Sequence, residues 1–237
     1  MVMPRRCRAN GRHRAAEDMR QLSATPAIQV TALQFAYGRR TVVDVPHCRL
    51  ARGGSMAVLG PSGCGKTTFL HLLAGLLRPG AGVQILGQQL ATLSGPALDR
   101  FRGRHIGLVF QRLHLLPALT VRENVLLAQR LARVPVEPGR MAALFDRLGL
   151  EGLEQHKPSM LSQGQAQRVA IARALVHGPA LVMADEPTSA LDDRHAEQAL
   201  ALLSDAARAG GAALLVVTHD QRVRGRLHDE FEMSALS

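Results

Sequence analysis

The chain is poor in aromatic residues, lysine and cysteine. Its 237 residues include six Phe, one Tyr and no Trp, and all but two of its 29 basic residues are Arg. Its cysteines, Cys7, Cys48 and Cys64, form neither a metal-binding spacing nor an even set for disulfides, which is typical of a reducing compartment. No apolar run approaches the roughly 18 residues that a membrane-spanning helix requires. These absences exclude a disulfide-based scaffold and predict a soluble or peripheral protein.

The basic residues are concentrated at the start of the chain. Residues 1–20 contribute +4 (six Arg against two acids) to the formal net charge of +10, and they show no apolar period. We therefore expect residues 1–27 to be a disordered basic arm, since a secretory signal would need an apolar segment. Met19 is an alternative start that would remove most of this arm. The remaining basic residues neither cluster nor alternate with aromatics, so an arginine-rich composition explains them and no nucleic-acid partner is expected.

Apolar periodicity predicts an α/β domain over residues 28–237. Residues 28–30, 33–35 and 42–45 alternate as strands do, and further strands are expected at 55–59, 85–87, 106–110, 181–184 and 213–217, with helices at 65–77, 163–176 and 193–208. Strands that alternate with helices indicate a wound parallel sheet. From about residue 112 to 159 the spacing is helical, at Val121, Val125, Leu126 and Leu131 for example. With the helix at 163–176, this predicts an inserted helical subdomain of about residues 112–176.

A glycine-rich loop follows the strand at 55–59 and opens the next helix. Both its pattern and its context fit a phosphate-binding loop, whose N–H groups and helix N-terminus surround phosphates. Lys66 is expected to reach the β- and γ-phosphates and Thr67 to ligate Mg²⁺. In this arginine-rich chain a lysine stands here because a compact ammonium fits inside the loop. A chance glycine-rich turn is the alternative. The loop reads Gly60, Pro61, Ser62, Gly63, Cys64, Gly65, Lys66, Thr67 and Thr68.

Two acids follow the strand at 181–184. Asp185, at the end of the strand, is placed to hold Mg²⁺, and Glu186 is suited to accept a proton from an attacking water or to orient it. Two surface acids at the end of a strand would be the ordinary alternative. The phosphate-binding loop in the same chain favours the catalytic interpretation.

The segment Leu161-Ser162-Gln163-Gly164-Gln165 stands at the start of the helix at 163–176. Ser162 can cap that helix, and Gly164 permits close backbone approach. Alone, this is a good capping sequence. A helix N-terminus with a serine hydroxyl is also suited to an anion. Because the phosphate-binding loop already has its own helix, we interpret this second site as serving the nucleotide of a neighbouring subunit.

With these motifs in this order, residues 28–225 resemble the ATP-binding subunits of ATP-binding cassette (ABC) transporters. The resemblance implies a P-loop NTPase (RecA-like) α/β core with an N-terminal antiparallel β subdomain and the inserted helical subdomain. The six motifs that carry it are Gly60–Thr68 (Walker A), Gln111 (Q-loop), Leu161–Gln165 (signature), Leu181–Glu186 (Walker B), Ser189–Asp192 (D-loop) and His219 (H-loop).

The resemblance also assigns roles to single residues. It implies that Tyr37 stacks on adenine, that Gln111 contacts Mg²⁺ and the attacking water, and that His219 contacts the γ-phosphate. Without the family resemblance, Tyr37 is equally explained as an edge-strand aromatic, Gln111 as a polar turn residue and His219 as the end of a strand. Across the dimer, Ser162, Gly164 and Gln165 would contact the nucleotide bound by the opposite subunit, and Asp192 would link the two sites.

Within the family, residues 109–125 are similar to the branch that serves lipoprotein release, macrolide-type efflux and a cell-division complex. Two departures stand out. Gln163 replaces the usual first glycine of the signature, and the chain ends soon after His219, where Asp229 to Ser237 only partly resembles the family's terminal strand and hairpin.

The resemblance implies a subunit that binds and hydrolyses ATP to power a membrane transporter, with ATP and Mg²⁺ as cofactors. Its expected partners are a transmembrane permease and a second ATP-binding subunit, a copy of the same chain, at the cytoplasmic face of the inner (plasma) membrane. An ATP-gated regulatory module of a membrane complex that transports nothing remains an alternative. A DNA-associated cassette ATPase would carry coiled-coil or zinc insertions, which this sequence lacks.

Overall fold

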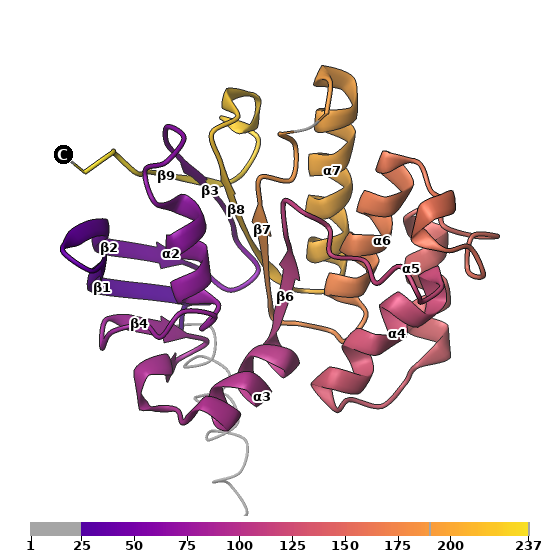
Figure 1. Ribbon diagram of the computed structural model, residues 1–237, viewed down its shortest axis with the longest axis horizontal. Helices are drawn as coiled ribbons and strands as arrows, with labels where there is room; N and C mark the ends of the chain where they lie inside the picture. The colour runs from indigo at the N-terminus through magenta and orange to yellow at the C-terminus, as the bar shows by residue number, and fades with distance from the viewer. Residues whose placement is uncertain (1–24, 190, 237) are drawn as a thin grey trace, which may run out of the picture.

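The computed structural model describes residues 25–189 and 191–236, so the predicted basic arm lies almost wholly outside the described residues. Figure 1 shows an antiparallel sheet beside a parallel one, with the helices packed around them. No helix of the described residues is long and apolar enough to span a membrane.

The antiparallel sheet has the strand order β2-β1-β4-β5. Its strands are β1 (Ile28–Tyr37), β2 (Arg40–Leu50), β4 (Val83–Ile85) and β5 (Gln88–Gln89). The first two strands form a hairpin whose turn is made by Gly38, at φ 62°, and Arg39. The strands expected separately at 28–30, 33–35 and 42–45 are therefore parts of two long strands. Two successive exposed residues, Thr31 and Ala32, interrupt the alternation within β1, and Ala32 has φ 51°.

The parallel sheet has the order β6-β7-β8-β3-β9. Successive side chains of a strand point to opposite faces, and both faces of this sheet are buried. In β7, Leu181 and Met183 pack in one core with helix α2 (Lys66–Leu73). Val182 and Ala184 pack in a second core with helices α6 (Gln163–Leu175) and α7 (Asp193–Ala209). The strands are β3 (Ser55–Leu59), β6 (Ile106–Val109), β7 (Leu181–Asp185), β8 (Ala213–Thr218) and β9 (Asp229–Glu232).

Helices cover both faces of the parallel sheet. Figure 1 shows α2 on one side of β6, β7 and β8, with α6 and α7 on the other. The helix predicted at 65–77 ends earlier, because the chain leaves the helix in turns at Ala74 to Leu77. The bounds are α2 (Lys66–Leu73), α3 (Gly95–His105), α4 (Val121–Ala132), α5 (Pro138–Arg147), α6 (Gln163–Leu175) and α7 (Asp193–Ala209), with short 3₁₀ turns η1 (Leu90–Thr92), η2 (Pro158–Met160) and η3 (Gln221–Val223).

The chain between β6 and β7 is helical, as its apolar spacing predicts. A capping box starts α4: the Thr120 hydroxyl accepts from the Glu123 N–H at 3.2 Å, and the Glu123 carboxylate accepts from the Thr120 N–H at 2.8 Å. Val121 and Val125 are fully buried, but Leu131 is 71% exposed, so it does not belong to the core face on which its spacing placed it.

The end of the chain adds a strand to the parallel sheet. β9 pairs with β3 from Met56 opposite Asp229 to Leu59 opposite Glu232, and the Met233 N–H then donates to the Leu59 carbonyl at 2.7 Å. The short terminal segment therefore supplies the edge strand of the sheet.

Candidate nucleotide-binding site

The parallel register brings the ends of four strands to one edge of the sheet. Leu59 of β3 lies opposite Thr218, Val217 of β8 lies opposite Asp185, and Ala184 of β7 lies opposite Val109. The loops after β3, β8, β7 and β6 therefore leave the sheet side by side. They carry the Walker A loop, the H-loop, the Walker B acids and the Q-loop. In open α/β sheets this carboxyl edge is where ligands bind.

The Walker A loop surrounds the Lys66 ammonium. Gly65 has φ 96°, and a Cβ there would lie 2.2 Å from the Val42 carbonyl oxygen of β2, so only glycine fits. Lys66 is 6% exposed, and its Nζ donates to the carbonyls of Gly60 at 2.9 Å and Pro61 at 3.0 Å. The ammonium thus lies inside the loop, where the sequence predicted a phosphate-binding cation.

The remaining loop residues divide by exposure. Pro61, Ser62 and Gly63 are exposed, whereas Cys64 is buried with its side chain in the core. The predicted contact of Cys64 with nucleotide is therefore left to its backbone.

Thr67 and Asp185 face one another across the carboxyl edge. The Thr67 hydroxyl donates to Asp185 Oδ1 at 3.1 Å. Burial raises the pKa of Asp185, and the hydrogen bond from Thr67 opposes that rise. A buried carboxylate beside a hydroxyl oxygen suits a hard cation, which prefers oxygen ligands and whose charge would favour the ionised form. The described residues contain no cluster of three or more His, Cys, Asp or Glu that could hold a metal.

Glu186 is held from several sides. Its carboxylate accepts from the Thr218 hydroxyl at 2.7 Å and from the His219 N–H at 3.0 Å, and the His219 Nδ1 lies 2.6 Å from Oε1. Lys66 Nζ lies 3.9 Å from the same Oε1. The structure therefore brings the predicted base together with the predicted γ-phosphate ligands, Lys66 and His219.

The signature segment caps α6. The Ser162 hydroxyl accepts from the Gln165 N–H at 3.2 Å, and Gln165 Oε1 accepts from the Ser162 N–H at 2.8 Å. Gly164 is exposed, and a Cβ added to it would meet no atom within 4 Å. Because α2 and α6 pack on opposite faces of the sheet, the fold of one chain separates this segment from its own Walker A helix.

Gln111 and Tyr37 are both exposed at the margin of the site. Gln111 follows β6 at the carboxyl edge. Tyr37 ends β1 with 53% of its surface exposed, and its ring packs edge-on against Phe35 at a centroid distance of 5.0 Å. The positions leave both side chains available to a ligand.

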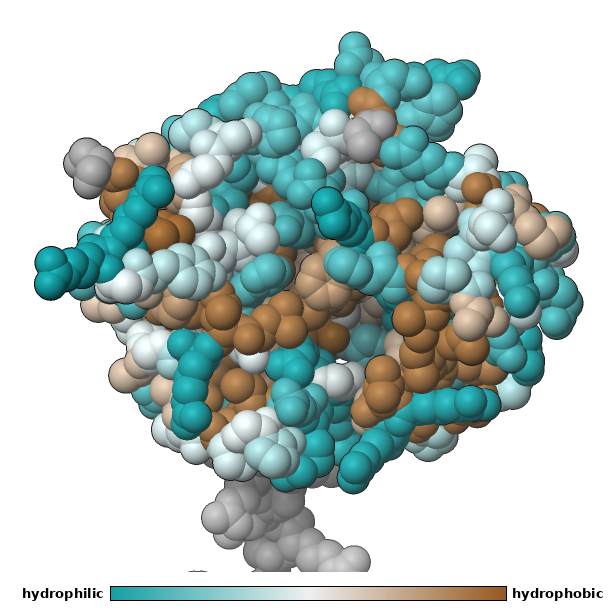
Figure 2. Space-filling model, viewed as in Figure 1, coloured by the Kyte–Doolittle hydropathy of each residue, from teal (hydrophilic) through white to brown (hydrophobic). Residues whose placement is uncertain are grey.

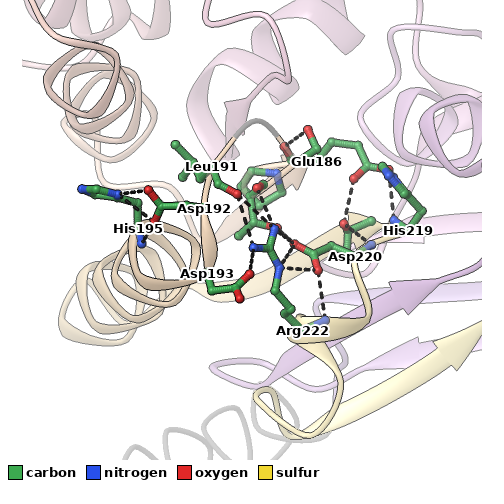
Figure 3. Close-up of polar contacts among 12 residues, drawn as sticks. Glu186, Leu191, Asp192, Asp193, His195, His219, Asp220 and Arg222 are labelled. Carbon is green, nitrogen blue, oxygen red and sulfur yellow. Dashed lines mark hydrogen bonds and ion pairs between the residues drawn. The ribbon is translucent and has the colours of Figure 1, made fainter.

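Sequence reasoning missed two arginines that connect the loops of the site. Arg173, in the last turn of α6, donates to the carbonyls of Leu113 and His114 at 2.6 and 2.7 Å, so it ties the signature helix to the segment after Gln111. Arg222 binds Asp220, just after the H-loop, and Asp193 at the start of α7 (Figure 3). The contacts of Arg173 and the contact between Arg222 and Asp193 follow no local pattern, because these partners lie about 30 to 60 residues apart in sequence and meet only through the sheet.

The fold and these motifs define the class first: a P-loop nucleotide-binding protein with a helical insertion between β6 and β7. The ABC transporter family profile then matches residues 43–189. The chain belongs to the ABC transporter family, as an ATP-binding subunit that hydrolyses ATP.

Relatives over most of the chain agree. The chain is 46% identical to the "Lipoprotein-releasing system ATP-binding protein LolD" of Chromohalobacter salexigens, over 76% of this chain and 77% of that protein. It is 41% identical to the "Macrolide export ATP-binding/permease protein MacB" of Sodalis glossinidius, over 84% of this chain but 31% of that longer protein.

Solved structures show the same fold. A bacterial ABC transporter cassette, MJ0796, solved as a dimer, superposes with a TM-score of 0.77 at 32% identity, covering 88% of this chain and 94% of that chain. A post-hydrolysis dimer of MJ0796 bound to ADP and phosphate gives a TM-score of 0.74 at 31% identity, covering 89% and 97%. The predicted fold class and family are confirmed.

Proposed function

We propose that this chain is the ATP-hydrolysing subunit of a membrane complex of the lipoprotein-release or macrolide-export type, and that it acts as a dimer with each ATP bound between two copies. The single observation that carries this is the convergence of Lys66, Glu186 and His219 at the end of a buried parallel sheet. The LolD and MacB relatives support the branch.

Within one chain, different residues bind the nucleotide, hold the metal ion and activate the water. Lys66 and the loop N–H groups bind the β- and γ-phosphates, and Tyr37 offers its ring to the adenine. Thr67 and Asp185 hold Mg²⁺ with Gln111, and the ion, when bound, neutralises charge that develops on the phosphate oxygens. Glu186 orients the attacking water and takes its proton.

His219 has a second part in this scheme. Its Nδ1 lies against the Glu186 carboxylate, so it fixes that carboxylate while it approaches the γ-phosphate itself. The reaction is ATP and water to ADP and phosphate.

The second copy completes the site. Gly164 lies in open space at the start of α6, where alanine would be the better helix former. Nothing among the described residues requires glycine there, which supports close approach by something outside the chain. We assign that place to the nucleotide bound by the partner's Walker A loop, contacted by Ser162, Gly164 and Gln165. Gln163 leaves this contact intact, because Ser162 and Gly164 both remain.

The helical side supports a membrane partner. Large apolar side chains are exposed between β6 and α5, namely Leu116, Leu131 and Val136. Figure 2 shows brown, apolar surface over the region of α4. Such surface on a polar protein marks an interaction site. We assign it to the transmembrane permease, which places the chain peripherally on the cytoplasmic face of the inner membrane.

The test of catalysis is Glu186→Gln. Without a carboxylate the water loses its base, and we expect ATP turnover to fall by roughly 10²- to 10⁴-fold. Binding of ATP, measured by a fluorescent analogue, should stay within the wild-type range, and turnover by the unchanged protein should require added Mg²⁺. A Glu186→Gln protein with full activity would remove Glu186 from its role.

A further inference from the structure

Arg222 connects two loops that meet only in the folded protein. Arg222 lies in η3. Its Nε lies 2.8 Å from Asp220 Oδ1 and its Nη2 lies 2.7 Å from Asp220 Oδ2, so the guanidinium binds that carboxylate in a bidentate manner. Its Nη1 donates to Asp193 Oδ1 at 2.7 Å, and its guanidinium also donates to the carbonyls of Leu191 at 3.3 Å and Thr188 at 3.4 Å. Figure 3 shows Arg222 between Asp193 and Asp220, with Leu191 above it. One side chain thus joins the turn after β8 to the loop between β7 and α7.

Asp220 continues this connection to the catalytic carboxylate. Its Oδ2 accepts from the Thr188 hydroxyl at 2.7 Å, and its N–H donates to the Thr218 hydroxyl oxygen at 2.9 Å. That same hydroxyl donates to Glu186 Oε2 at 2.7 Å. The Asp220 side chain is 8% exposed, and hydrogen bonds from Arg222 lower its pKa to about 2, so it is ionised at neutral pH. A nearly buried carboxylate depends on its cationic partner, because it is costly to leave unpaired.

Glu186 needs such support. Its φ is 48°, in the left-handed region, which is strained for a residue other than glycine and persists only when the surroundings fix it. Its N–H donates to the Val217 carbonyl of β8 at 2.8 Å, and its own carbonyl accepts from the Ser189 hydroxyl at 3.1 Å. The backbone of Glu186 is therefore held by β8 on one side and by the loop after β7 on the other. Those are the elements that Arg222 joins.

We propose that Arg222 is a positioning residue for Glu186 in ATP hydrolysis. It fixes the loop after β7 against the turn after β8 and so sets the direction of the Glu186 carboxylate without touching nucleotide. This inference rests on the catalytic role of Glu186 proposed above. It predicts that loss of Arg222 impairs the chemical step and spares ATP binding, because Lys66 and the Walker A loop make no contact with it.

The first experiment compares Arg222→Gln with Arg224→Gln in the full-length chain. Arg224 is a matched control, since it lies two residues away and binds Gln221, Glu230 and Glu232 rather than the loop between β7 and α7. For Arg222→Gln we expect kcat to fall by roughly ten- to a hundredfold, the range that a small misplacement of a catalytic group produces. KM for ATP should stay within about twofold, since binding is not affected. Arg222→Lys should show a smaller fall in kcat than Arg222→Gln, because an ammonium restores the charge but not the bidentate hydrogen bonding. Arg224→Gln should behave as wild type.

Three results would overturn the proposal: an unchanged kcat in Arg222→Gln, an equal loss in Arg224→Gln, or a loss that appears wholly in KM. If Arg222→Gln does not fold, Asp193→Asn tests the positioning role of Arg222 instead. It removes the negative charge of one partner of Arg222 and leaves the contact with Asp220, so kcat should fall severalfold at constant KM, and an unchanged kcat would refute the proposal.

A double-mutant cycle separates this inference from the proposed function. In single-turnover measurements, adding Arg222→Gln to Glu186→Gln should lower the residual rate no further, because Arg222 acts through the carboxylate that is already lost. Additive losses would show a role independent of Glu186. A Glu186→Gln protein with wild-type turnover would refute the proposed function itself. An inactive Glu186→Gln with a fully active Arg222→Gln would refute only the positioning role.

Discussion

Substituting Gly164 by alanine should separate the stability of one chain from the assembly of two. An added methyl group at Gly164 meets no atom within 4 Å, and Gly164 is the second residue of α6. Alanine is favoured over glycine in a helix by up to about 1 kcal/mol. We therefore expect Gly164→Ala to leave the midpoint of thermal unfolding unchanged or to raise it.

The same methyl group should weaken the dimer. At the partner's nucleotide it would enter a closely packed contact, where an added methylene-sized group costs typically 1–3 kcal/mol. Since about 1.4 kcal/mol is a factor of ten, ATP-dependent dimerisation should weaken by roughly ten- to a hundredfold. Sedimentation of Gly164→Ala in the Glu186→Gln background, at a series of protein concentrations, measures this directly.

Gly139 supplies the matched control for this comparison. It is the second residue of α5, and an added Cβ there also meets nothing within 4 Å. Gly139→Ala should likewise leave the midpoint of thermal unfolding unchanged or raise it, but it should leave dimerisation as in the parent protein. A Gly164→Ala protein that dimerises as well as the parent would contradict a contact between Gly164 and the partner's nucleotide. A lower unfolding temperature of the isolated Gly164→Ala chain would show that glycine is needed within one chain.

Two further predictions follow from buried groups. Lys66→Ala should weaken ATP binding by roughly ten- to a hundredfold, since a charge-assisted hydrogen bond contributes about 1.5–3 kcal/mol, and an unchanged affinity in an equilibrium titration would remove Lys66 from its role. Burial lowers the pKa of His177 from 6.5 to about 4. Because the folded state binds this proton more weakly than the unfolded state, stability falls as the pH drops from 6.5 towards 4, by about 2 kcal/mol at pH 5. Urea unfolding at pH 7 and pH 5 should show this loss, and His177→Gln should remove that part of it; an identical pH dependence in the variant would contradict the assignment.

Local patterns were sufficient for most of the elements around the site. β3, α6, β7 and β8 were predicted within a residue or two, because long apolar runs and a clear cap mark them. α3 was missed for the opposite reason: its sequence is largely polar and Leu98 is its one buried residue, so no apolar period marks it. Leu131 was assigned to a core face, yet it is exposed, because apolar spacing does not show how far along its length a helix packs against its neighbours.

The sequence motifs predicted which residues form the site, but not the hydrogen bonds that connect its loops. Motif chemistry predicted that Lys66, Asp185, Glu186 and His219 would meet, since parallel strands end at a common edge. The backbone conformation of Glu186 and its support through Thr218, Asp220 and Arg222 depend on how two distant loops pack. An arginine four residues after a strand has no local signal for that contact. The roles of Lys66, Asp185, Glu186 and His219 towards a ligand stay predictions, as do those of Tyr37, Gln111 and Gln165.

The mass and nucleotide content of Glu186→Gln protein with ATP and Mg²⁺ show whether ATP is bound between two copies of this chain. Sedimentation equilibrium should give the 25.5 kDa chain alone without nucleotide. With ATP it should give twice that mass, about 51 kDa, carrying two ATP per two chains. A 25.5 kDa species that holds ATP tightly as a single chain would contradict the account.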